Sequence, residues 1–238
     1  MAATVYLIPS LLHEEGLQSM PSYIIDAVKQ CQSFFVEEEK TARRFLKKLD
    51  KEIVIDNYEW YPASAPLQGP DTYDPLIVFK QKIKEEKTIG IISEAGCPGI
   101  ADPGQQLVAI AQDLNIEVKP LVGPNSILLA LMASGMNGQQ FRFNGYLPIK
   151  DHERSKIIKE LETESAKKNC TQIFIETPYR NNQLIDALLS NCRSSTKICI
   201  AVDLTGEKEF IKTKTIGDWK KNKPDIHKRP AIFLLHAS

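Results

Sequence analysis

Residues 88–114, TIGIISEAGCPGIADPGQQLVAIAQDL, decide the fold of this chain. The apolar, largely β-branched run at its start predicts a strand from Thr88 to Ser93. A glycine-rich turn follows, and apolar residues then recur at helical spacing from Gln105 to Leu114. Asp102 followed by Pro103 is typical of a helix N-cap with proline in the first turn. A strand, a tight turn and a helix in this order predict one repeat of a parallel α/β sheet.

The same alternation continues on both sides of this stretch. Apolar runs predict further strands at Thr4 to Ile8, Phe34 to Glu37, Ile53 to Asn57 and Val118 to Val122. Helical periodicity predicts helices at Tyr23 to Gln32, Thr41 to Leu49, Pro75 to Lys84 and Ser126 to Ser134. The aromatic and proline-rich stretch between them, Tyr58 to Asp74, predicts a long loop. We therefore expect residues 1–140 to form an α/β domain whose parallel sheet carries helices on both faces.

The pattern changes after Phe141, where a second domain, residues 141–238, is expected. A polar helical run from His152 to Lys168 leads into it, and a second helix is predicted from Tyr179 to Asn191. Strands are predicted at Gln172 to Glu176, Lys197 to Leu204, Phe210 to Ile216 and Pro230 to His236. Because strands outnumber helices here, the second α/β domain should contain a mixed sheet.

The composition is that of a globular protein and excludes several classes. The 238 residues are 42% hydrophobic and 25% charged, which argues against disorder and against a coiled coil. No stretch has the roughly 18 consecutive apolar residues of a membrane span, so we expect a soluble protein that does not bind membranes. The odd number of cysteines without a C-x-x-C pair fits a reducing cytoplasm best. The 30 basic residues balance the 30 acidic ones, so a polyanion would need a local cationic patch. The five cysteines and four histidines lack the spacing of a disulfide framework or a metal site, so no metal is expected.

The glycines of the turn permit a ligand to approach the main chain closely. Their spacing is neither G-x-x-x-x-G-K-[ST] nor G-x-G-x-x-G, so neither a nucleoside triphosphate nor a dinucleotide is indicated. A second turn, LVGPNS at residues 121–126, follows the next predicted strand. Two adjacent strand-end turns rich in Gly and Pro predict one shared crevice, although a stiff connection between strand and helix would explain either turn alone.

Four motifs in order, SEAGCPGIADPG, LVGPNS, FNGYLP and IFIETPYR, resemble the tetrapyrrole methylase superfamily of S-adenosylmethionine-dependent methyltransferases. The chain is most similar to its branch of small-subunit ribosomal RNA 2′-O-ribose methyltransferases acting on cytidine. The resemblance implies a two-domain fold with S-adenosyl-L-methionine in a cleft between the domains, a ribosomal RNA substrate and a homodimer. The chain departs from the family pattern near its start, where the T-P-I-G-N-L stretch of relatives is replaced by IPSLLHEEGL at residues 8–17.

Carried over by matching positions, the resemblance implies a set of cofactor-binding residues from both domains. They are Glu94, Ala95, Gly96, Cys97, Ile100, Asn125, Ser126, Glu176, Thr177, Pro230 and Ala231. Cys97 is expected to contribute mainly its backbone. Alignment of two reactants can account for about 7 to 11 kcal/mol of a barrier, so methyl transfer requires no acid–base pair. A ribose hydroxyl still gains from a carboxylate, and the candidates for this catalytic role are Glu94 and Asp203, whereas Asp102 is expected to cap its helix.

RNA recognition requires cationic and aromatic side chains. Arg43 and Arg44, on one short helix with Lys47 and Lys48, are the candidate substrate-binding cations, and Tyr146 is a further candidate contact. Cations also crowd the C-terminal region at Lys212, Lys214, Lys220, Lys221, Lys223, Lys228 and Arg229. Stacking surfaces are expected from Tyr58, Trp60, Tyr61 and Tyr73. A solvated charged face is the simpler explanation of either cationic cluster alone.

Three functions therefore stay open. The motifs favour an RNA methyltransferase, and the zero net charge argues mildly against it. A methyltransferase of a tetrapyrrole or another small metabolite would share the cofactor site and differ in its acceptor pocket. A homologue that binds the cofactor without catalysis is the third possibility, because the altered loop at residues 8–17 permits it.

Overall fold

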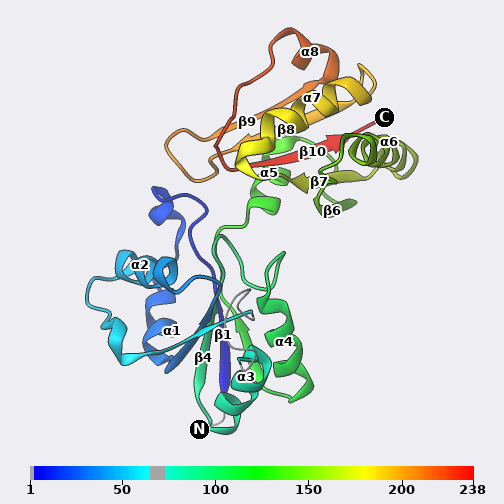
Figure 1. The fold of residues 1–238 in the computed structure, drawn as a ribbon. Coiled ribbons are helices and arrows are strands. Elements are labelled where there is room, and N and C mark those ends of the chain that lie inside the picture. The colour runs from blue at the N-terminus through cyan, green and yellow to red at the C-terminus, as the bar shows by residue number, and fades with distance from the viewer. Residues whose placement is uncertain (1–2, 65–72) are drawn as a thin grey trace. The chain divides into compact units, whose positions relative to one another are not determined.

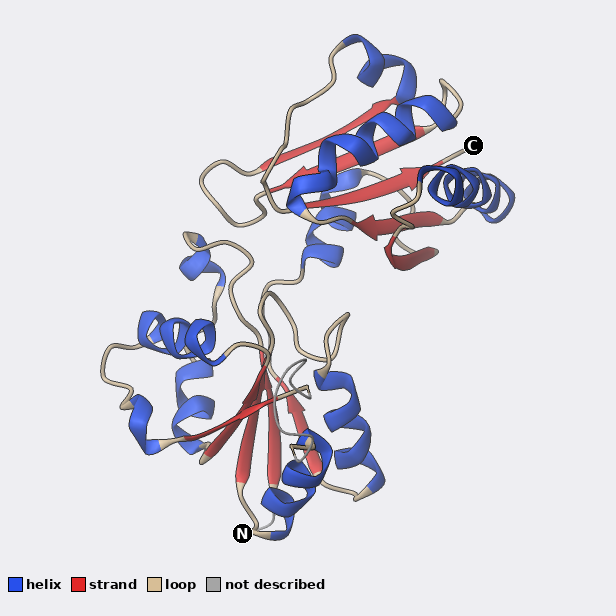
Figure 2. Cartoon of the chain, in the orientation of Figure 1, coloured by secondary structure: helices blue, strands red, loops and turns tan. Residues whose placement is uncertain are grey.

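A computed structural model describes residues 3–64 and 73–238, which divide into two compact units, Met1–Asn125 and Ser126–Ser238. Each is an α/β unit built on a five-stranded sheet, as the sequence predicts (Figures 1 and 2). The division lies earlier than the expected boundary after residue 140, because helix α5 (Ser126–Ser134) packs on strands of the second unit. Within the described part of the chain, no helix is long and apolar enough to cross a membrane.

The sheet of the first unit is parallel, with strand order β3-β2-β4-β1-β5. Its strands are β1 (Thr4–Ile8), β2 (Ser33–Val36), β3 (Glu59–Pro62), β4 (Thr88–Ile92) and β5 (Glu117–Pro120). Its α-helices are α1 (Ile24–Gln30), α2 (Glu39–Leu49), α3 (Pro75–Lys84) and α4 (Gly104–Asp113). Short 3-10 helices form at η1 (Gly16–Ser19) and η2 (Ile55–Asn57).

Helices cover both faces of this sheet because its strands are apolar on both sides. Alternating strand residues such as Ile8 and Phe34 face α1 and α2 in one buried cluster. Their neighbours, including Val5 and Phe35, face α3 and α4 in a second cluster. The helix that follows β1 or β2 therefore lies on one face, and the helix that follows β3 or β4 lies on the other.

The strand predicted at Ile53 to Asn57 is wrong. Residues Ile55–Asn57 form the 3-10 helix η2, and the edge strand β3 comes later, inside the predicted loop. Trp60 and Tyr61 of β3 stack on Phe34 and Phe35 at ring-centroid distances of 5.0 and 5.2 Å. Aromatic packing against the core thus overrides the loop signal of the neighbouring prolines. Residues 65–72 of that stretch lie outside the described residues.

The same stretch holds the aromatic residues that are expected to stack on RNA bases, and the structure shows their contacts within the chain. Tyr58 meets Phe34 edge-on at 5.0 Å, and the Tyr73 hydroxyl donates to the Pro62 carbonyl at 2.8 Å. Together with Trp60 and Tyr61, these rings are half-buried rather than free, so they stabilise the sheet edge.

The second unit contains a mixed sheet of order β6-β7-β10-β8-β9, which confirms the prediction. Only β6 and β7 pair in parallel, and the other neighbours are antiparallel. Its strands are β6 (Phe141–Tyr146), β7 (Thr171–Ile175), β8 (Lys197–Val202), β9 (Phe210–Thr215) and β10 (Ala231–His236). Besides α5, its helices are α6 (Asp151–Lys168), η3 (Pro178–Arg180), α7 (Asn181–Asn191) and α8 (Ile216–Lys221).

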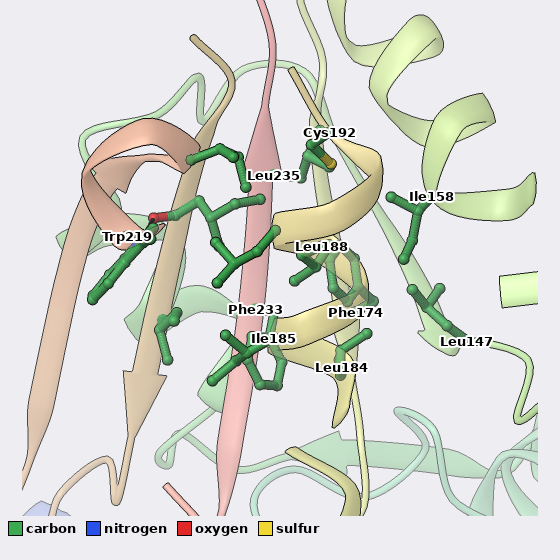
Figure 3. Packing of buried hydrophobic residues seen from close by; sticks show 14 of the residues in the cluster. Leu147, Ile158, Phe174, Leu184, Ile185, Leu188, Cys192, Trp219, Phe233 and Leu235 are labelled. Carbon is green, nitrogen blue, oxygen red and sulfur yellow. Dashed lines mark hydrogen bonds between the residues drawn. The ribbon is translucent and has the colours of Figure 1, made fainter. Parts of the chain in front are cut away.

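The main core of the second unit lies between this sheet and helices α6, α7 and α8. Figure 3 shows Leu184 and Leu188 of α7 pointing toward Phe174 and Phe233 on neighbouring strands. Helix α8, which was not predicted, anchors here through Trp219, whose indole N–H donates to the Ile198 carbonyl at 2.9 Å. Six residues of α8 are too short for a periodic signal.

Candidate functional site at the carboxyl ends of the first sheet

The first unit has a topological switch point between its adjacent strands β1 and β4. The chain leaves β1 toward α1 on one face of the sheet and leaves β4 toward α4 on the other. In open α/β sheets, ligands bind in the crevice outside the carboxyl ends of strands at such a point. Here the Ser10 N–H donates to the Gly96 carbonyl at 2.8 Å, so the two diverging loops are joined where they begin to separate.

The turn after β4 is held in an unusual conformation by hydrogen bonds within itself. Gly96 has φ +77°, and a Cβ placed there would lie 3.2 Å from Leu12 Cδ2 and 3.3 Å from the Pro124 carbonyl. The Ser93 hydroxyl donates to the Gly96 carbonyl at 3.1 Å. Asp102 Oδ1 accepts from the N–H groups of Gly99 and Gly104, at 2.9 and 2.8 Å. Asp102 therefore bonds the N–H of Gly104, the first residue of α4, although the N-cap position itself is held by Pro103 and not by Asp102 as expected.

The turn after β5 lies against the turn after β4 and against the start of the loop after β1. The Cys97 thiol lies 3.6 Å from the Pro124 carbonyl and 3.9 Å from that of Gly123. Gly123 is required because a Cβ there would come within 2.3 Å of Pro9, just after β1. Asn125 follows this turn at the end of the first unit. Four of the predicted cofactor contacts, Glu94 to Cys97, thus lie in one backbone turn, and exposed Ile100 follows three residues after Cys97.

A cavity of about 370 Å³ opens beside this turn, within the first unit. Its lining residues come from the loop after β1, from one face of α2 and from the end of β4. They are Ser10, Leu11, Leu12, His13, Glu14, Thr41, Ala42, Arg44, Phe45, Lys48, Ile92, Ser93, Glu94 and Ala95. The altered loop at residues 8–17 therefore supplies one wall.

Carboxylates gather at this edge of the sheet. Burial raises the pKa of Glu94, and the negative charges of Glu37 and Glu38 raise it further. Burial also raises the pKa of Glu37, against the hydrogen bond that its Oε1 accepts from the Glu94 N–H at 3.2 Å. Burial raises the pKa of Asp102 in the same way, although the Gly99 and Gly104 N–H groups act against it. Such groups hold a proton more readily than exposed carboxyls do.

The two candidate substrate-binding arginines diverge in the structure. Arg44 lines the cavity, and within residues 3–64 and 73–238 it forms no ion pair. Arg43 instead forms an ion pair with Glu39 at 2.7 Å, and its guanidinium carbon lies 5.3 Å from the centre of the Trp60 ring. The Arg43 side chain therefore makes its contacts on another face of α2, outside the cavity lining.

In the second unit, the predicted site residues gather at one end of the sheet. Tyr146 pairs in register with Ile175, the residue before Glu176. Ala231 pairs with Val202, the residue before Asp203. Because β10 runs antiparallel to β7 and β8, its first residues lie beside the last residues of both strands. This sheet end therefore collects Tyr146, Glu176, Thr177, Asp203, Pro230 and Ala231.

Both acidic residues of this sheet end are paired. The fully buried Glu176 side chain accepts from Arg180 Nη2 at 2.6 Å and from the Thr177 N–H at 2.7 Å, while its Oε2 is buried without a partner. Asp203 accepts from Arg229 Nε at 2.7 Å. The carboxylate of Asp203 is therefore paired with a cation, whereas Glu94 lines the cavity and is hydrogen-bonded to the Glu38 backbone and the Thr41 side chain.

The family follows from a comparison of sequences. Residues 22–220 match the sequence model of a family described as Tetrapyrrole (Corrin/Porphyrin) Methylases. The chain belongs to the tetrapyrrole methylase family. The matched range includes the turn after β4, the cavity helix α2 and most of the second sheet.

Curated relatives within this family share about a third of the aligned residues. Ribosomal RNA small subunit methyltransferase I of Halalkalibacterium halodurans is 29% identical over 202 residues, which are 82% of this chain and 65% of that protein. The protein of the same name from Vibrio cholerae is 32% identical over 162 residues, 67% of this chain and 55% of that protein. The chain thus matches less than two thirds of the length of either relative.

Solved structures of methylases support the fold. Diphthine synthase superposes with a TM-score of 0.66 over 99% of this chain and 90% of its own, at 10% identity. Uroporphyrin-III C-methyltransferase from Thermus thermophilus, complexed with S-adenosylhomocysteine, gives a TM-score of 0.56 at 13% identity, over 98% of this chain and 97% of its own. At these identities the likeness concerns the fold.

Several residues of the candidate site were not predicted. They are His13 and Thr41, which line the cavity beside Arg44 and Lys48 of the predicted cationic helix. Thr41, Arg44 and Lys48 recur at i, i+3 and i+7, so they share a helix face, but the sequence does not show which loop covers that face. The sequence did point to Glu37, since this carboxylate is the last residue of a predicted strand. The sequence also pointed to Arg180, which is the last residue of the IFIETPYR motif.

Proposed function

We propose that this chain is an S-adenosylmethionine-dependent methyltransferase that acts in the cytoplasm on a ribose 2′-hydroxyl of small-subunit ribosomal RNA. The observation that carries the proposal is the Gly96 turn, joined to the loop after β1 at the switch point of a methylase fold. The curated relatives, named as small-subunit ribosomal RNA methyltransferases, support the choice of substrate.

The residues of the turn are suited to the proposed cofactor. Exposed Glu94 offers a carboxylate for an ammonium group or for ribose hydroxyls, and exposed Ile100 offers an apolar contact. Gly96 lacks a side chain at a point where Leu12 and the Pro124 carbonyl leave little room for one, so the turn keeps this tight shape. S-adenosylmethionine, when bound, supplies a methyl group on a positively charged sulfur. We propose that Glu94, Ala95, Gly96, Cys97, Ile100 and Asn125 bind it, with further contacts from Ser126, Glu176, Thr177, Pro230 and Ala231.

In the proposed reaction, the chain aligns the acceptor and moves one proton. The ribose oxygen would use a lone pair to form the new O–C bond in place of the methyl–sulfur bond, whose electron pair would stay on the sulfur. The hydroxyl proton would pass to the Glu94 carboxylate and then to water. Partial burial and the negative charges of Glu37 and Glu38 raise the pKa of Glu94, which makes it a better proton acceptor than a carboxylate without these neighbours. Alignment of the two reactants and exclusion of water account for the larger part of the lowering of the activation barrier, on the order of 7 to 11 kcal/mol.

The test combines cofactor binding with substrate mapping. Calorimetry should detect binding of S-adenosylhomocysteine to the wild-type protein. Transfer of labelled methyl groups should occur to small-subunit ribosomal RNA, and mass mapping should place the methyl group on a ribose. Glu94→Gln should lower kcat about tenfold or more, since general base catalysis contributes about 100-fold or more. Binding without RNA methylation would favour a small-molecule acceptor, and absent binding would reject the proposal.

We further propose that the protein is a homodimer. Helix α5 supports this, because a helix that is apolar on all sides is normally buried. One face packs on β9 and β10, whereas Leu128 and Met132 are 49% and 78% exposed. Light scattering should give the mass of two chains, and Met132→Asp should shift the mass toward one. A single-chain mass for the wild type at micromolar concentration would reject the dimer.

A further inference from the structure

We propose that the cavity between α2 and the loop after β1 is the acceptor-nucleotide site, which binds one nucleotide of single-stranded RNA with its phosphate on Arg44 and Lys48. The inference rests on the proposed function, because it names where the methylated RNA is held. It assigns the altered loop at residues 8–17 to substrate recognition.

The size and lining of the cavity suit a nucleotide. Its volume of about 370 Å³ is near the lower end of small-ligand pockets, which span about 300 to 1,000 Å³. That is room for one nucleotide rather than for a four-ring macrocycle. Leu12, Phe45 and Ile92 provide apolar surface for a base, and Ser10 and Thr41 provide hydroxyls.

The cations of the cavity are available to a phosphate. Arg44 is exposed and forms no ion pair with any described residue. Lys48 donates to the backbone carbonyl of Glu14, a neutral partner that leaves its charge uncompensated. The acidic groups of the lining are Glu14 and Glu94, and His13 is its remaining titratable group. A guanidinium and an ammonium one helical turn apart are typical phosphate ligands.

The position of the cavity connects it to the proposed chemistry. Its lining includes Glu94 and Ala95, whereas the next residues face the turn after β5, where the Cys97 thiol approaches the Pro124 carbonyl. The short segment from Glu94 to Cys97 therefore has the cavity on one side and the β5 turn on the other. An acceptor ribose in the cavity would contact the Glu94 carboxylate, which is the proposed proton acceptor.

Helix α2 carries its own control, because it has two further cations at the same spacing outside the cavity. Arg43 contacts Glu39 and Trp60, and Lys47 donates to the Lys51 carbonyl at 3.0 Å. Arg44→Gln/Lys48→Gln and Arg43→Gln/Lys47→Gln remove the same charge from the same helix. General attraction between a basic helix and RNA predicts equal effects, whereas a nucleotide site predicts unequal ones.

The experiment measures methylation of a ribosomal RNA fragment over a salt series for the wild type and both double variants. Circular dichroism and S-adenosylhomocysteine calorimetry confirm folding and cofactor binding. For Arg44→Gln/Lys48→Gln we expect KM for RNA to rise about tenfold or more, because hydrogen bonds to charged groups contribute about 1.5 to 3 kcal/mol each. The log–log salt slope should fall by about 0.7 for each lost phosphate contact. Arg43→Gln/Lys47→Gln should change KM less than threefold.

The outcomes separate the inference from the function on which it rests. Equal KM values for the two double variants, with an active wild type, would overturn the acceptor site and leave the proposed function standing. A wild type that binds S-adenosylhomocysteine but does not methylate RNA would overturn both. Methylation of uroporphyrinogen in place of RNA, lost in Arg44→Gln/Lys48→Gln, would assign these cations to substrate carboxylates and reject the nucleotide.

Discussion

The backbone N–H of Ser10 and the carbonyl of Gly96 are joined by a 2.8 Å hydrogen bond that links the loop after β1 to the turn after β4. Ser10 is 4% exposed, so the bond is shielded from water. The loop and the turn each supply part of the proposed acceptor site. A change in the backbone at Gly96 should therefore disturb both the cofactor turn and the wall beside it.

Gly96→Val should abolish S-adenosylhomocysteine binding while leaving the circular dichroism spectrum unchanged. A β-branched residue at φ +77° is strained, and its Cβ would lie 3.2 Å from Leu12 Cδ2. We expect the free energy of unfolding to fall by about 1 to 3 kcal/mol. Gly135→Val is the control, since Gly135 has φ +67° with no atom within 4 Å of the added Cβ. The Gly135→Val protein should lose stability and keep its affinity for S-adenosylhomocysteine. Undiminished binding of S-adenosylhomocysteine by Gly96→Val would show that the turn is not the cofactor site.

Glu37→Gln should move the acid limb of the kcat profile to lower pH. Negative charge on Glu37 raises the pKa of Glu94, so removing that charge lowers the pKa of the proposed base. The amide oxygen of Gln can still accept from the Glu94 N–H. Methylation rates between pH 4 and 8, with Glu52→Gln as an exposed control, measure the shift. An unmoved profile would mean that Glu94 does not titrate in the rate-limiting step.

The same variant should be more stable than the wild type at neutral pH. The pKa of Glu37 is raised by folding, so its contribution to stability is fully present below the ordinary value near 4.5 and is lost as pH rises through the folded value. A neutral Gln removes that loss. Thermal melts should show Glu37→Gln above the wild type at pH 7, with the difference vanishing below pH 4. The opposite order at pH 7 would contradict the burial of this carboxyl.

Arg180→Met should destabilise the second unit by about 3 kcal/mol, because it leaves the fully buried Glu176 carboxylate without its cation. Urea unfolding measures the loss, and Glu176→Gln in the same chain should recover part of it. Lys223→Met removes an exposed ion pair with Asp186 at 2.7 Å and should cost less than about 1 kcal/mol. Similar losses for Arg180→Met and Lys223→Met would show that Glu176 is solvated in solution.

Trp60→Ala should lower the free energy of unfolding by about 3 kcal/mol and leave RNA affinity within twofold, measured where the variant is folded. The ring stacks on Phe34 at 5.0 Å and lies beneath the Arg43 guanidinium, so it serves the core. A large loss of RNA binding without a loss of stability would restore the view of this ring as a stacking surface for bases.

The sequence predicted the fold where local signals and burial agreed. Thr4–Ile8, Pro75–Lys84 and Ser126–Ser134 begin and end where the structure has β1, α3 and α5. The failure at Ile53 to Asn57 has a physical cause. An apolar run was assigned a strand, but the sheet edge is formed by Trp60 and Tyr61, whose rings find partners on β2 that no local pattern displays.

The candidate site was predictable only in part. The turn at Glu94 to Cys97 is encoded locally by glycines after a strand, so its place at the strand end could be read from the chain. The difference between Arg43 and Arg44 could not be predicted from the sequence, because the two residues are neighbours on one basic helix. Only the tertiary positions of Trp60 and the loop after β1 show which arginine is free.

The central place of β10 in the second sheet determines the order in which the chain can complete its folding. β10 pairs with both β7 and β8, although those strands precede it by many residues. During synthesis, the first unit has all its strands once Pro120 has emerged from the ribosome. The second unit must wait for His236, with Phe174 and Ile200 lacking their sheet partner until then. A nascent chain arrested before residue 231 would therefore display one finished unit and two separate strand pairs, β6–β7 and β8–β9, with exposed apolar residues that chaperones bind.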